Sequence, residues 1–196
     1  MSICEQKRPT PEEALNPLAD KADEAAALNF RAPRPEDGPA VSALIRECPP
    51  LDVNSAYCNL LQCLHFADTC VVAERNGKMV GWISAYRPPA EPERIFVWQV
   101  AVHEHARGLG LGRRMLDALL DRPASRGATT LITTITEAND ASWALFGSFA
   151  RRHGADIHRR PLFDRDVHFA GAHDTELLVS IGPLGAQSAL SVKEAS

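Results

Sequence analysis

The sequence has no excess of positive charge and no long run of apolar residues, and each absence excludes a class of protein. Lysine and arginine number 21 against 25 aspartates and glutamates, which gives a net charge of −4 at pH 7. Nucleic-acid binders and polybasic membrane-surface proteins instead carry a strong cationic excess. The longest uncharged stretch, residues 177–192, is interrupted by glycine, proline, glutamine and serine, so it is not a membrane span.

Cysteine is also scarce, and its pattern excludes a disulfide scaffold. The five cysteines are odd in number, and none forms a C-x-x-C or another metal-ligand pair. A reduced, cytoplasmic protein is the simplest interpretation. The first residues lack the apolar segment of a secretory signal, so no such signal is expected. The cysteines are Cys4, Cys48, Cys58, Cys63 and Cys70.

Length and composition favour one globular domain. A chain of 196 residues is close to the size of a single domain. Its 45% hydrophobic and 23% charged residues are ordinary for a folded protein. Residues 1–26 are rich in Ala, Glu, Asp, Lys and Pro and are predicted to form a mobile tail. A second mobile tail is predicted at residues 184–196, which leaves residues 27–183 as the domain.

Hydrophobic periodicity predicts strands and helices that build a central sheet. Residues 95–102 are apolar at nearly every position, so we expect this strand to be covered on both faces. The predicted strands are residues 28–32, 69–74, 79–86, 95–102, 130–136 and 175–181. The predicted helices lie around 41–48, from about 55 with an apolar stripe of Tyr57, Leu60, Leu61 and Leu64, around 111–120, and at 141–153. The expected class is α/β (α+β), with a mixed, mostly antiparallel sheet flanked by helices.

A glycine-rich loop, residues 107–112, is the most informative segment. It joins an apolar strand to a helix, and glycine allows both a positive φ and the close approach of a ligand. The free N–H groups at the start of the helix make it an anion site suited to a pyrophosphate. The loop lacks the Gly-Lys-Ser/Thr of a P-loop. It also lacks the third glycine of a Rossmann fingerprint, because Arg113 or Met115 stands there.

The remaining pattern, Arg107 with Gly110 and Gly112 after an apolar strand, resembles the acetyl-CoA loop of the GNAT superfamily of N-acetyltransferases. The resemblance implies an acyl-CoA N-acyltransferase domain. It also implies that Asn139 contacts the pantetheine arm, although Asn139 is equally suited to capping a helix. Many members place a tyrosine near the sulfur as a general acid, whereas Phe146 stands at that position here. The implied acetyl-CoA-binding residues are Val100, Ala101, Val102, Arg107, Gly108, Leu109, Gly110, Leu111, Gly112, Asn139 and Phe146.

A closer resemblance, to the L-2,4-diaminobutyrate acetyltransferase family of ectoine biosynthesis, covers about 150 residues. It rests on residues 50–57, 81–86, 96–102 and 173–176. It implies transfer of acetyl from acetyl-CoA to the γ-amine of L-2,4-diaminobutyrate, which gives N4-acetyl-L-2,4-diaminobutyrate. It also implies a homodimer. An acetyltransferase for another diamine or for a protein N-terminus, and a non-catalytic acyl-CoA sensor, remain alternatives.

Substrate-binding candidates follow from the charges of a diamino acid, which needs acceptors for two ammonium groups and donors for one carboxylate. Asp52 and Glu176 are the favoured ammonium ligands, with His173 as an orienting partner. The alternatives are a turn or helix-cap role for Asp52 and a salt bridge at the rim for Glu176. Asn54 and Ser55 are candidate donors, and helix capping is expected of one of them. Tyr57 and Trp98 are candidate contacts with the substrate stem, and packing in the core or under a helix is the alternative for both.

The chemistry requires a base. An alkylammonium has a pKa of about 10.4, which is about 3.4 units above pH 7. Forming the neutral amine at that pH therefore costs about 4.6 kcal/mol. Glu176 is the candidate general base, and the N–H of Val100 or Val102 is the candidate donor to the thioester carbonyl. Direct attack in a ternary complex is predicted, because no cysteine has a recognisable nucleophile setting. The histidines do not form a ligand set, so no metal is expected.

Overall fold

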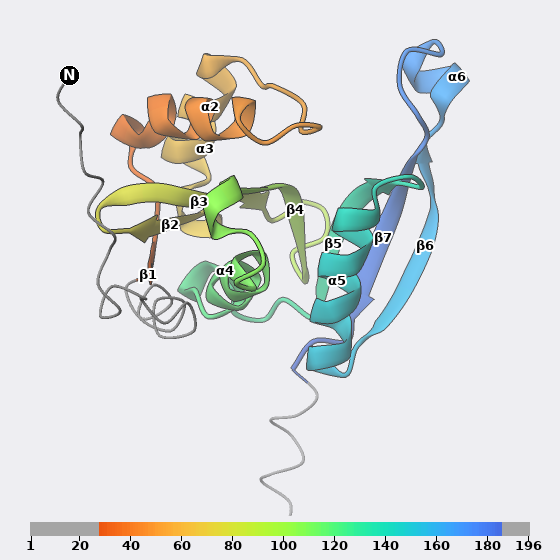
Figure 1. Cartoon of the computed structure of the whole chain (residues 1–196). Helices are drawn as coiled ribbons and strands as arrows, with labels where there is room; N and C mark the ends of the chain where they lie inside the picture. Colours follow the sequence, from red (N-terminus) through yellow and green to blue (C-terminus); the bar gives the residue numbers. More distant parts are fainter. Residues whose placement is uncertain (1–27, 186–196) are drawn as a thin grey trace, which may run out of the picture.

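The computed structural model describes residues 28–185, which form one seven-stranded sheet with the order β1-β2-β3-β4-β5-β7-β6 (Figure 1). Among these strands only β4 and β5 pair in parallel, and every other neighbouring pair is antiparallel. The strands are β1 (Leu28–Arg31), β2 (Val71–Arg75), β3 (Lys78–Tyr86), β4 (Arg94–Val102), β5 (Thr130–Thr136), β6 (Asp156–Phe163) and β7 (Glu176–Gly182).

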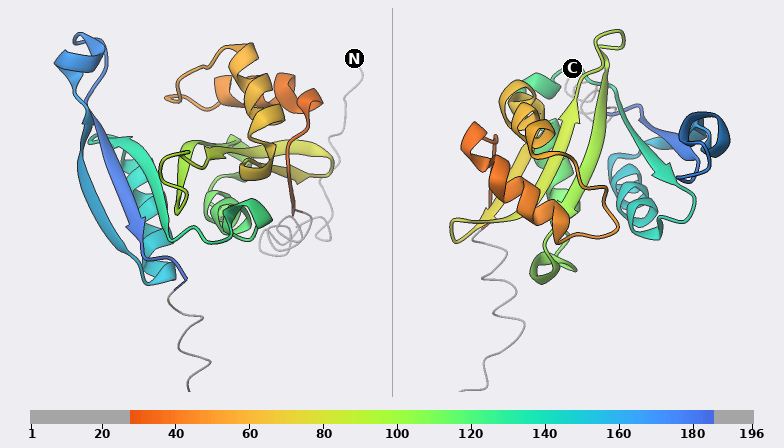
Figure 2. Two further views of the ribbon diagram at one scale, coloured as in Figure 1. Left: turned by 180° about the vertical axis from the view of Figure 1, so that it is seen from behind. Right: turned by 90° about the horizontal axis from the view of Figure 1, so that it is seen from above.

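Helices cover both faces of the sheet. Two of them lie over one face of β2–β4, and a third lies on the opposite face (Figure 1). A fourth packs beside the third and covers β5, β7 and β6, while a short fifth helix caps the far end of the β6–β7 pair (Figure 2). In that order they are α2 (Gly38–Arg46) with α3 (Ala56–His65), α4 (Leu111–Leu120), α5 (Asp140–His153) and α6 (Arg165–Phe169). None of the described helices is long and apolar enough to cross a membrane.

The predicted mixed sheet is confirmed, and each predicted strand and helix has a counterpart within about three residues of its expected ends. Strand β6 and helix α6 were not predicted. Nearly every side chain of β6 is exposed, so its sequence lacks the alternation of apolar and polar residues that marks a strand. Pairing with β7 at the edge of the sheet makes it a strand. The first predicted tail, residues 1–26, lies outside the described residues, and so do residues 186–196 of the second. The prediction that this second tail begins at 184 is wrong, because Leu184 packs against the core and its N–H donates to the Thr129 carbonyl at 2.7 Å.

The expectation that the strand at 95–102 is covered on both faces is wrong. Buried and partly exposed residues alternate along β4, and Trp98 is 44% exposed. The cause is a bulge: Val97 pairs with Ala85 and Gln99 with Ser84, so Trp98 has no partner on β3. The bulge also changes the faces of the side chains: Val97 packs in the main core with α4, whereas Ala101 packs against α2.

The apolar stripe predicted on the second helix faces outward and not into the core. Tyr57, Leu60 and Leu64 are 70%, 40% and 55% exposed. The buried side of α3 consists of Asn59, Gln62 and Cys63. The Asn59 amide donates to the Ser42 hydroxyl at 2.7 Å, so α3 is joined to α2 by polar groups. Core packing as an explanation for Tyr57 is therefore wrong in the single chain.

Arg31 anchors the edge strand β1 through two carboxylates. Its guanidinium contacts Asp37 at 2.7 and 2.9 Å and Glu74 at 2.5 Å. These hydrogen bonds hold the pKa of both carboxyls below their usual range. A depressed carboxyl pKa stabilises the fold above the unfolded pKa, and this stabilisation is lost as the pH falls through the folded pKa.

We therefore expect Arg31→Met to lower the free energy of unfolding by about 1–2 kcal/mol at pH 7, a value that allows for partial exposure of the pair. The difference from the unmodified protein should shrink as the pH drops toward 3, because the carboxyls then become protonated in both proteins. Urea unfolding at pH 7, 5 and 3.5 measures this. A difference that does not depend on pH would mean that Arg31 stabilises only by packing.

Candidate active site

The sheet opens between its two central strands. Pairing between β4 and β5 ends at Val97 and Thr133, although β4 continues to Val102 and β5 to Thr136. The bulge at Trp98 directs the last part of β4 away from β5. The second half of β4 therefore has a partner strand only on the β3 side. Its other edge offers backbone groups to a ligand.

The backbone of Val100 is among the groups on that free edge. The His103 N–H donates to the Val80 carbonyl of β3. Because backbone groups point alternately to the two sides of a strand, those of Ala101 also point to β3 and those of Val100 and Val102 point away. The Val102 carbonyl already accepts from the Arg107 side chain at 3.1 Å and from the Cys48 thiol at 3.3 Å. The Val100 N–H therefore points to the free edge of β4, where it is available to a ligand.

The glycine loop follows directly. Gly108 and Gly110 have φ of +77° and +67°, values that residues other than glycine rarely adopt. Gly110 caps α4, and the first helical hydrogen bond runs from the Arg114 N–H to its carbonyl. The preceding amides of the loop and first turn are thus available to an anion. Gly112 allows close helix packing, because a Cβ there would lie 3.2 Å from Leu145 of α5.

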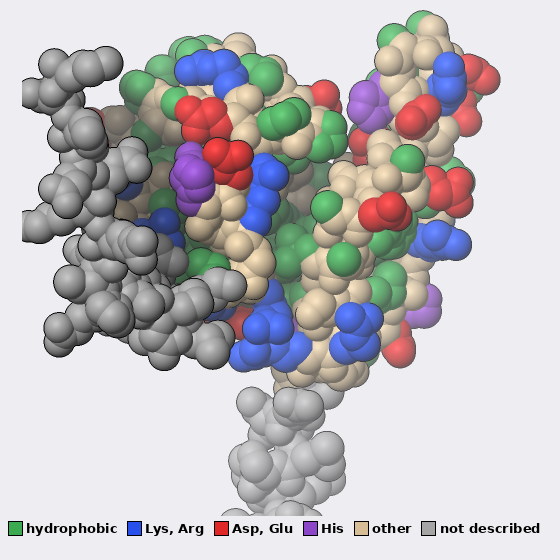
Figure 3. Space-filling view, in the orientation of Figure 1, with side chains coloured by type: hydrophobic (Ala, Val, Ile, Leu, Met, Phe, Trp, Pro, Cys, Tyr) green, Lys and Arg blue, Asp and Glu red, His purple; other side chains and the backbone are tan. Residues whose placement is uncertain are grey.

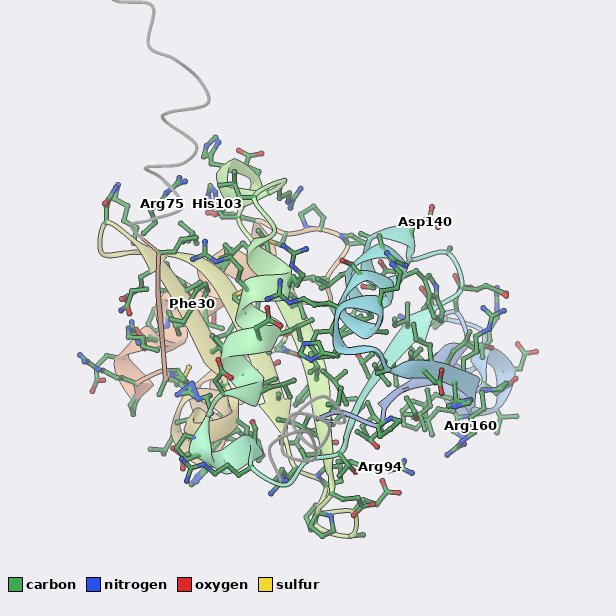
Figure 4. All side chains as sticks on the ribbon, turned by 90° about the horizontal axis from the view of Figure 1, so that it is seen from below. Phe30, Arg75, Arg94, His103, Asp140 and Arg160 are labelled. Atoms are coloured by element: carbon green, nitrogen blue, oxygen red, sulfur yellow. The ribbon has the colours of Figure 1, made fainter. Side chains whose placement is uncertain are left out.

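Helices α4 and α5 begin at the same end of the molecule. They follow β4 and β5, the parallel pair, whose carboxyl ends meet at one edge of the sheet. His103, just past β4, and Asp140, the first residue of α5, lie toward the same end in Figure 4. Ligands of α/β sheets bind at such an edge, where the chain connections reverse direction. The geometry therefore supports an anionic, extended cofactor between the two helix starts.

Two further cofactor candidates have structural roles in this chain. The Asn139 side chain accepts from the Ser142 N–H at 3.0 Å and caps α5, which is one of the two roles expected of it. Phe146 is 3% exposed and belongs to the main hydrophobic core with Phe149. The position of Phe146 explains why a phenol hydroxyl is dispensable for the fold there.

Three titratable side chains from distant segments meet beside this edge. His173 Nε2 lies 3.9 Å from Glu176 Oε1 and 4.0 Å from Asp52 Oδ2. Asp52 belongs to the loop between α2 and α3, and the other two belong to the α6–β7 segment. Figure 3 shows an open notch between the α2–α3 side of the molecule and the α6 end. The contact of Asp52 with His173 thus connects the two sides.

The imidazole of His173 is oriented by its neighbour in the chain. Its Nδ1 lies 2.8 Å from the Asp174 carbonyl, which can only accept, so Nδ1 carries a proton. Nε2 then faces two carboxylates, which favours the doubly protonated ring. The hydrogen bond to Asp174 and the charges of Glu176 and Asp52 raise the pKa of His173. Phe169 of α6 packs against the same ring at 4.8 Å between centroids, so α6 also fixes it.

Glu176 is the buried member of the group, with 18% of its side chain exposed. It begins β7 on the face opposite α5, since Val179 and Ile181, of the other parity, pack in the core beneath α5. Burial raises the pKa of Glu176, while Thr134 and His173 oppose the shift. Its Oε2 is buried, and no partner for it is found among the described residues. A carboxylate oxygen in that position is suited to an ammonium ligand or a proton.

The other substrate candidates are divided between the site and the fold. Ser55 caps α3 by accepting from the Cys58 N–H, which confirms that one of the two candidate donors is a cap. Asn54 donates to the Gln99 side chain at 2.7 Å. Trp98 lies at the bulge and Tyr57 on the outer side of α3, and both are exposed. Sequence reasoning missed Gln99, since an amide within an apolar strand carries no motif.

Comparison with known sequences shows the family of this chain. The sequence model of the Acetyltransferase (GNAT) family matches residues 39–150. An L-2,4-diaminobutyric acid acetyltransferase of Methylotuvimicrobium alcaliphilum is 50% identical over 162 residues, which cover 83% of this chain and 94% of the relative. A protein of the same name from Vibrio cholerae is 49% identical over 152 residues, 78% of this chain and 88% of the relative.

Solved structures show the same likeness. The diaminobutyrate acetyltransferase EctA from Paenibacillus lautus, in complex with its substrate L-2,4-diaminobutyric acid and coenzyme A, has a TM-score of 0.76 and 38% identity. The match covers 80% of this chain and 95% of that one. Ard1 from Thermoplasma volcanium, at a TM-score of 0.63 and 16% identity, shares the fold over 80% of this chain and 98% of its own.

Proposed function

This chain belongs to the Acetyltransferase (GNAT) family and to its L-2,4-diaminobutyric acid acetyltransferases, and from that premise we propose that it acetylates the γ-amine of L-2,4-diaminobutyrate. Acetyl-CoA is the acyl donor and N4-acetyl-L-2,4-diaminobutyrate the product, a step of ectoine biosynthesis. The observation that carries the proposal is the carboxylate pair, Asp52 and Glu176, at 4.0 and 3.9 Å from His173 and next to the free edge of β4.

The proposed binding mode divides the diamino acid between the two sides of the notch. Asp52, with 84% of its side chain exposed, receives an ammonium group from the α2–α3 side. Glu176 receives the reacting γ-nitrogen through its buried, unpartnered Oε2. The raised pKa of His173 favours the imidazolium, whose charge balances the two carboxylates before the substrate enters. The same imidazolium can then contact the carboxylate of the bound diamino acid. Trp98 and Tyr57 provide exposed apolar surface for the methylene stem.

The proposed reaction is direct attack of the neutral amine on the thioester carbon. Glu176 first takes one proton from the γ-ammonium, which frees the lone pair of the nitrogen, and its raised pKa brings it closer to the pH at which it must work. As the C–N bond forms, the Val100 N–H, on the free edge of β4, donates to the thioester oxygen, where negative charge develops. The C–S bond then breaks, and the leaving CoA thiolate takes the second proton that the nitrogen loses, which gives the amide and the free thiol. The amides at the start of α4 hold the pyrophosphate throughout.

The proposal is tested by the free thiol released from acetyl-CoA. We expect fast release with L-2,4-diaminobutyrate, and at least tenfold lower kcat/KM with ornithine, lysine or 2-aminobutyrate, because each misplaces or lacks the distal amine. Mass spectrometry of the product should place the acetyl group on the γ-nitrogen. Equal turnover of the longer diamines would replace the substrate but keep the reaction class. Tight binding of acetyl-CoA without release would favour a peptide acceptor or an acyl-CoA sensor.

Two aspects of the cellular setting belong to the same proposal. We expect a homodimer, which sedimentation velocity at several protein concentrations would measure. We also expect a cytoplasmic location. The four cysteines between residues 28 and 185 are all free, and three of them are buried, which is typical of proteins kept in a reducing compartment.

A further inference from the structure

Gln99 connects the cofactor strand to the acceptor loop. Its side-chain Nε2 donates to the Asp52 carbonyl at 2.8 Å, and its Oε1 accepts from the Asn54 side chain at 2.7 Å. Gln99 is itself 7% exposed. We propose that Gln99 is a positioning residue that sets the place of the Asp52 carboxylate, and through it the affinity for the diamino acid. This inference rests on the proposed function.

The two contacts determine the orientation of the amide. A backbone carbonyl can only accept, so the NH₂ group of Gln99 must face Asp52. The oxygen of Gln99 is then left for the Asn54 NH₂ group, as observed. One buried amide thus satisfies both a donor and an acceptor of the loop, and no other side chain of similar length offers both. A buried polar group of this kind is costly to leave without its partners, so the arrangement is stable only as a unit.

The loop has little else to fix it. Residues 52–55 are neither helix nor strand. Within residues 28–185, the backbone groups of Asp52, Val53 and Asn54 make no hydrogen bond to other backbone groups. The Asp52 side chain is 84% exposed, and its ion-pair partner there, His173, is 4.0 Å away. The position of the carboxylate is therefore set by its backbone, and the backbone by Gln99.

The bulge in β4 explains why one strand can serve both substrates. Trp98 takes no partner on β3, and this extra residue turns Gln99 toward α2 and α3 together with Ala101. The next residue, Val100, then presents its backbone to the free edge where the acyl donor is expected. Removing Gln99 should thus loosen the acceptor loop and leave the cofactor edge in place.

We test this with Gln99→Met, which keeps the length of the side chain, and Gln99→Glu, which keeps the acceptor but loses the donor when ionised. The KM for L-2,4-diaminobutyrate should rise about 10- to 100-fold in both, as expected for loss of one or two buried hydrogen bonds. The KM for acetyl-CoA should stay within about twofold. Ser84→Ala is the matched control: Ser84 pairs with Gln99 across the strands, is equally buried, and its hydroxyl has no partner among the described residues.

A second readout does not depend on activity. Amide hydrogen exchange of residues 52–55 should accelerate in Gln99→Met and remain unchanged in Ser84→Ala. The proposal would be overturned if Gln99→Met had the same KM values and the same amide exchange as Ser84→Ala. It would also be overturned if the KM for acetyl-CoA rose as much as the KM for L-2,4-diaminobutyrate. Absence of diaminobutyrate turnover in the unmodified protein would instead refute the proposed function, while altered exchange at residues 52–55 would still support the role of Gln99 in the loop.

Discussion

Replacing Glu176 by glutamine should lower kcat for diaminobutyrate by about 10²–10⁴-fold, the range for loss of a general base. The substitution keeps the size of a side chain that is only 18% exposed and removes its ability to accept a proton. The amine must lose a proton at a cost of about 4.6 kcal/mol at pH 7. Among the residues gathered at the site, Glu176 is the one whose oxygen is both buried and unpartnered.

The pH dependence separates a base from a simple ammonium ligand. Glu176 acts as a base only when ionised, so kcat of the unmodified enzyme should rise with pH through its raised pKa. In Glu176→Gln that limb should disappear, while a residual rate should grow toward the pKa of the free amine. Stopped-time thiol release from pH 5 to 10 with saturating substrates measures both effects.

His173→Gln is the companion variant, because the imidazole is the other group able to carry a proton there. It should raise KM for the diamino acid but keep the acidic limb of the profile. If the limb vanishes in His173→Gln and persists in Glu176→Gln, the base is the histidine and the assignment of Glu176 is wrong. Loss of fold is checked by thermal unfolding. Glu176→Gln should stay folded at pH 7 with a loss of at most about 1 kcal/mol, because it keeps the size of the side chain and removes only the ion pair with His173 at 3.9 Å.

The strands and helices that pack in the core were predictable because burial gives them a period. In α4 the apolar residues show the repeat that an amphipathic helix requires, and β5 is marked by its run of β-branched residues. The same reasoning failed where the hydrophobic pattern of an element does not match the side that is buried. In α3 the polar side is buried and the apolar side exposed, and β6 owes its conformation to pairing with β7 at the edge of the sheet. Both effects depend on contacts with other elements, so the local sequence does not predict them.

The candidate site was predictable in part, for a related reason. The glycine loop has local chemistry, so its sequence alone indicated an anion site with positive φ, and Gly108 and Gly110 have that conformation. Asp52, His173 and Glu176 were assigned from resemblance. Only the fold brings the two carboxylates, which are far apart in the sequence, within 4.0 Å of the His173 ring. Gln99 was not predicted, because its role depends on a bulge that no residue type marks.

Replacing Gly108 by alanine should weaken coenzyme A binding at least tenfold, or about 1.4 kcal/mol. Gly108 has φ of +77°, and a Cβ there would meet no protein atom within 4 Å. The space it would enter adjoins the free amides at the start of α4, where the pyrophosphate is expected to approach the backbone. The methyl group should keep the phosphate from these amides. Calorimetric titration with coenzyme A measures the loss directly, without turnover.

Gly77→Ala supplies a control with nearly the same backbone strain. Gly77 has φ of +74° in the turn between β2 and β3, and a Cβ there also meets nothing within 4 Å. The cost of a left-handed alanine, about 1–2 kcal/mol, should therefore lower the thermal stability of both variants by a similar amount. Only Gly108→Ala should lose affinity for coenzyme A. Equal affinities in the two variants would show that the pyrophosphate does not lie against this loop.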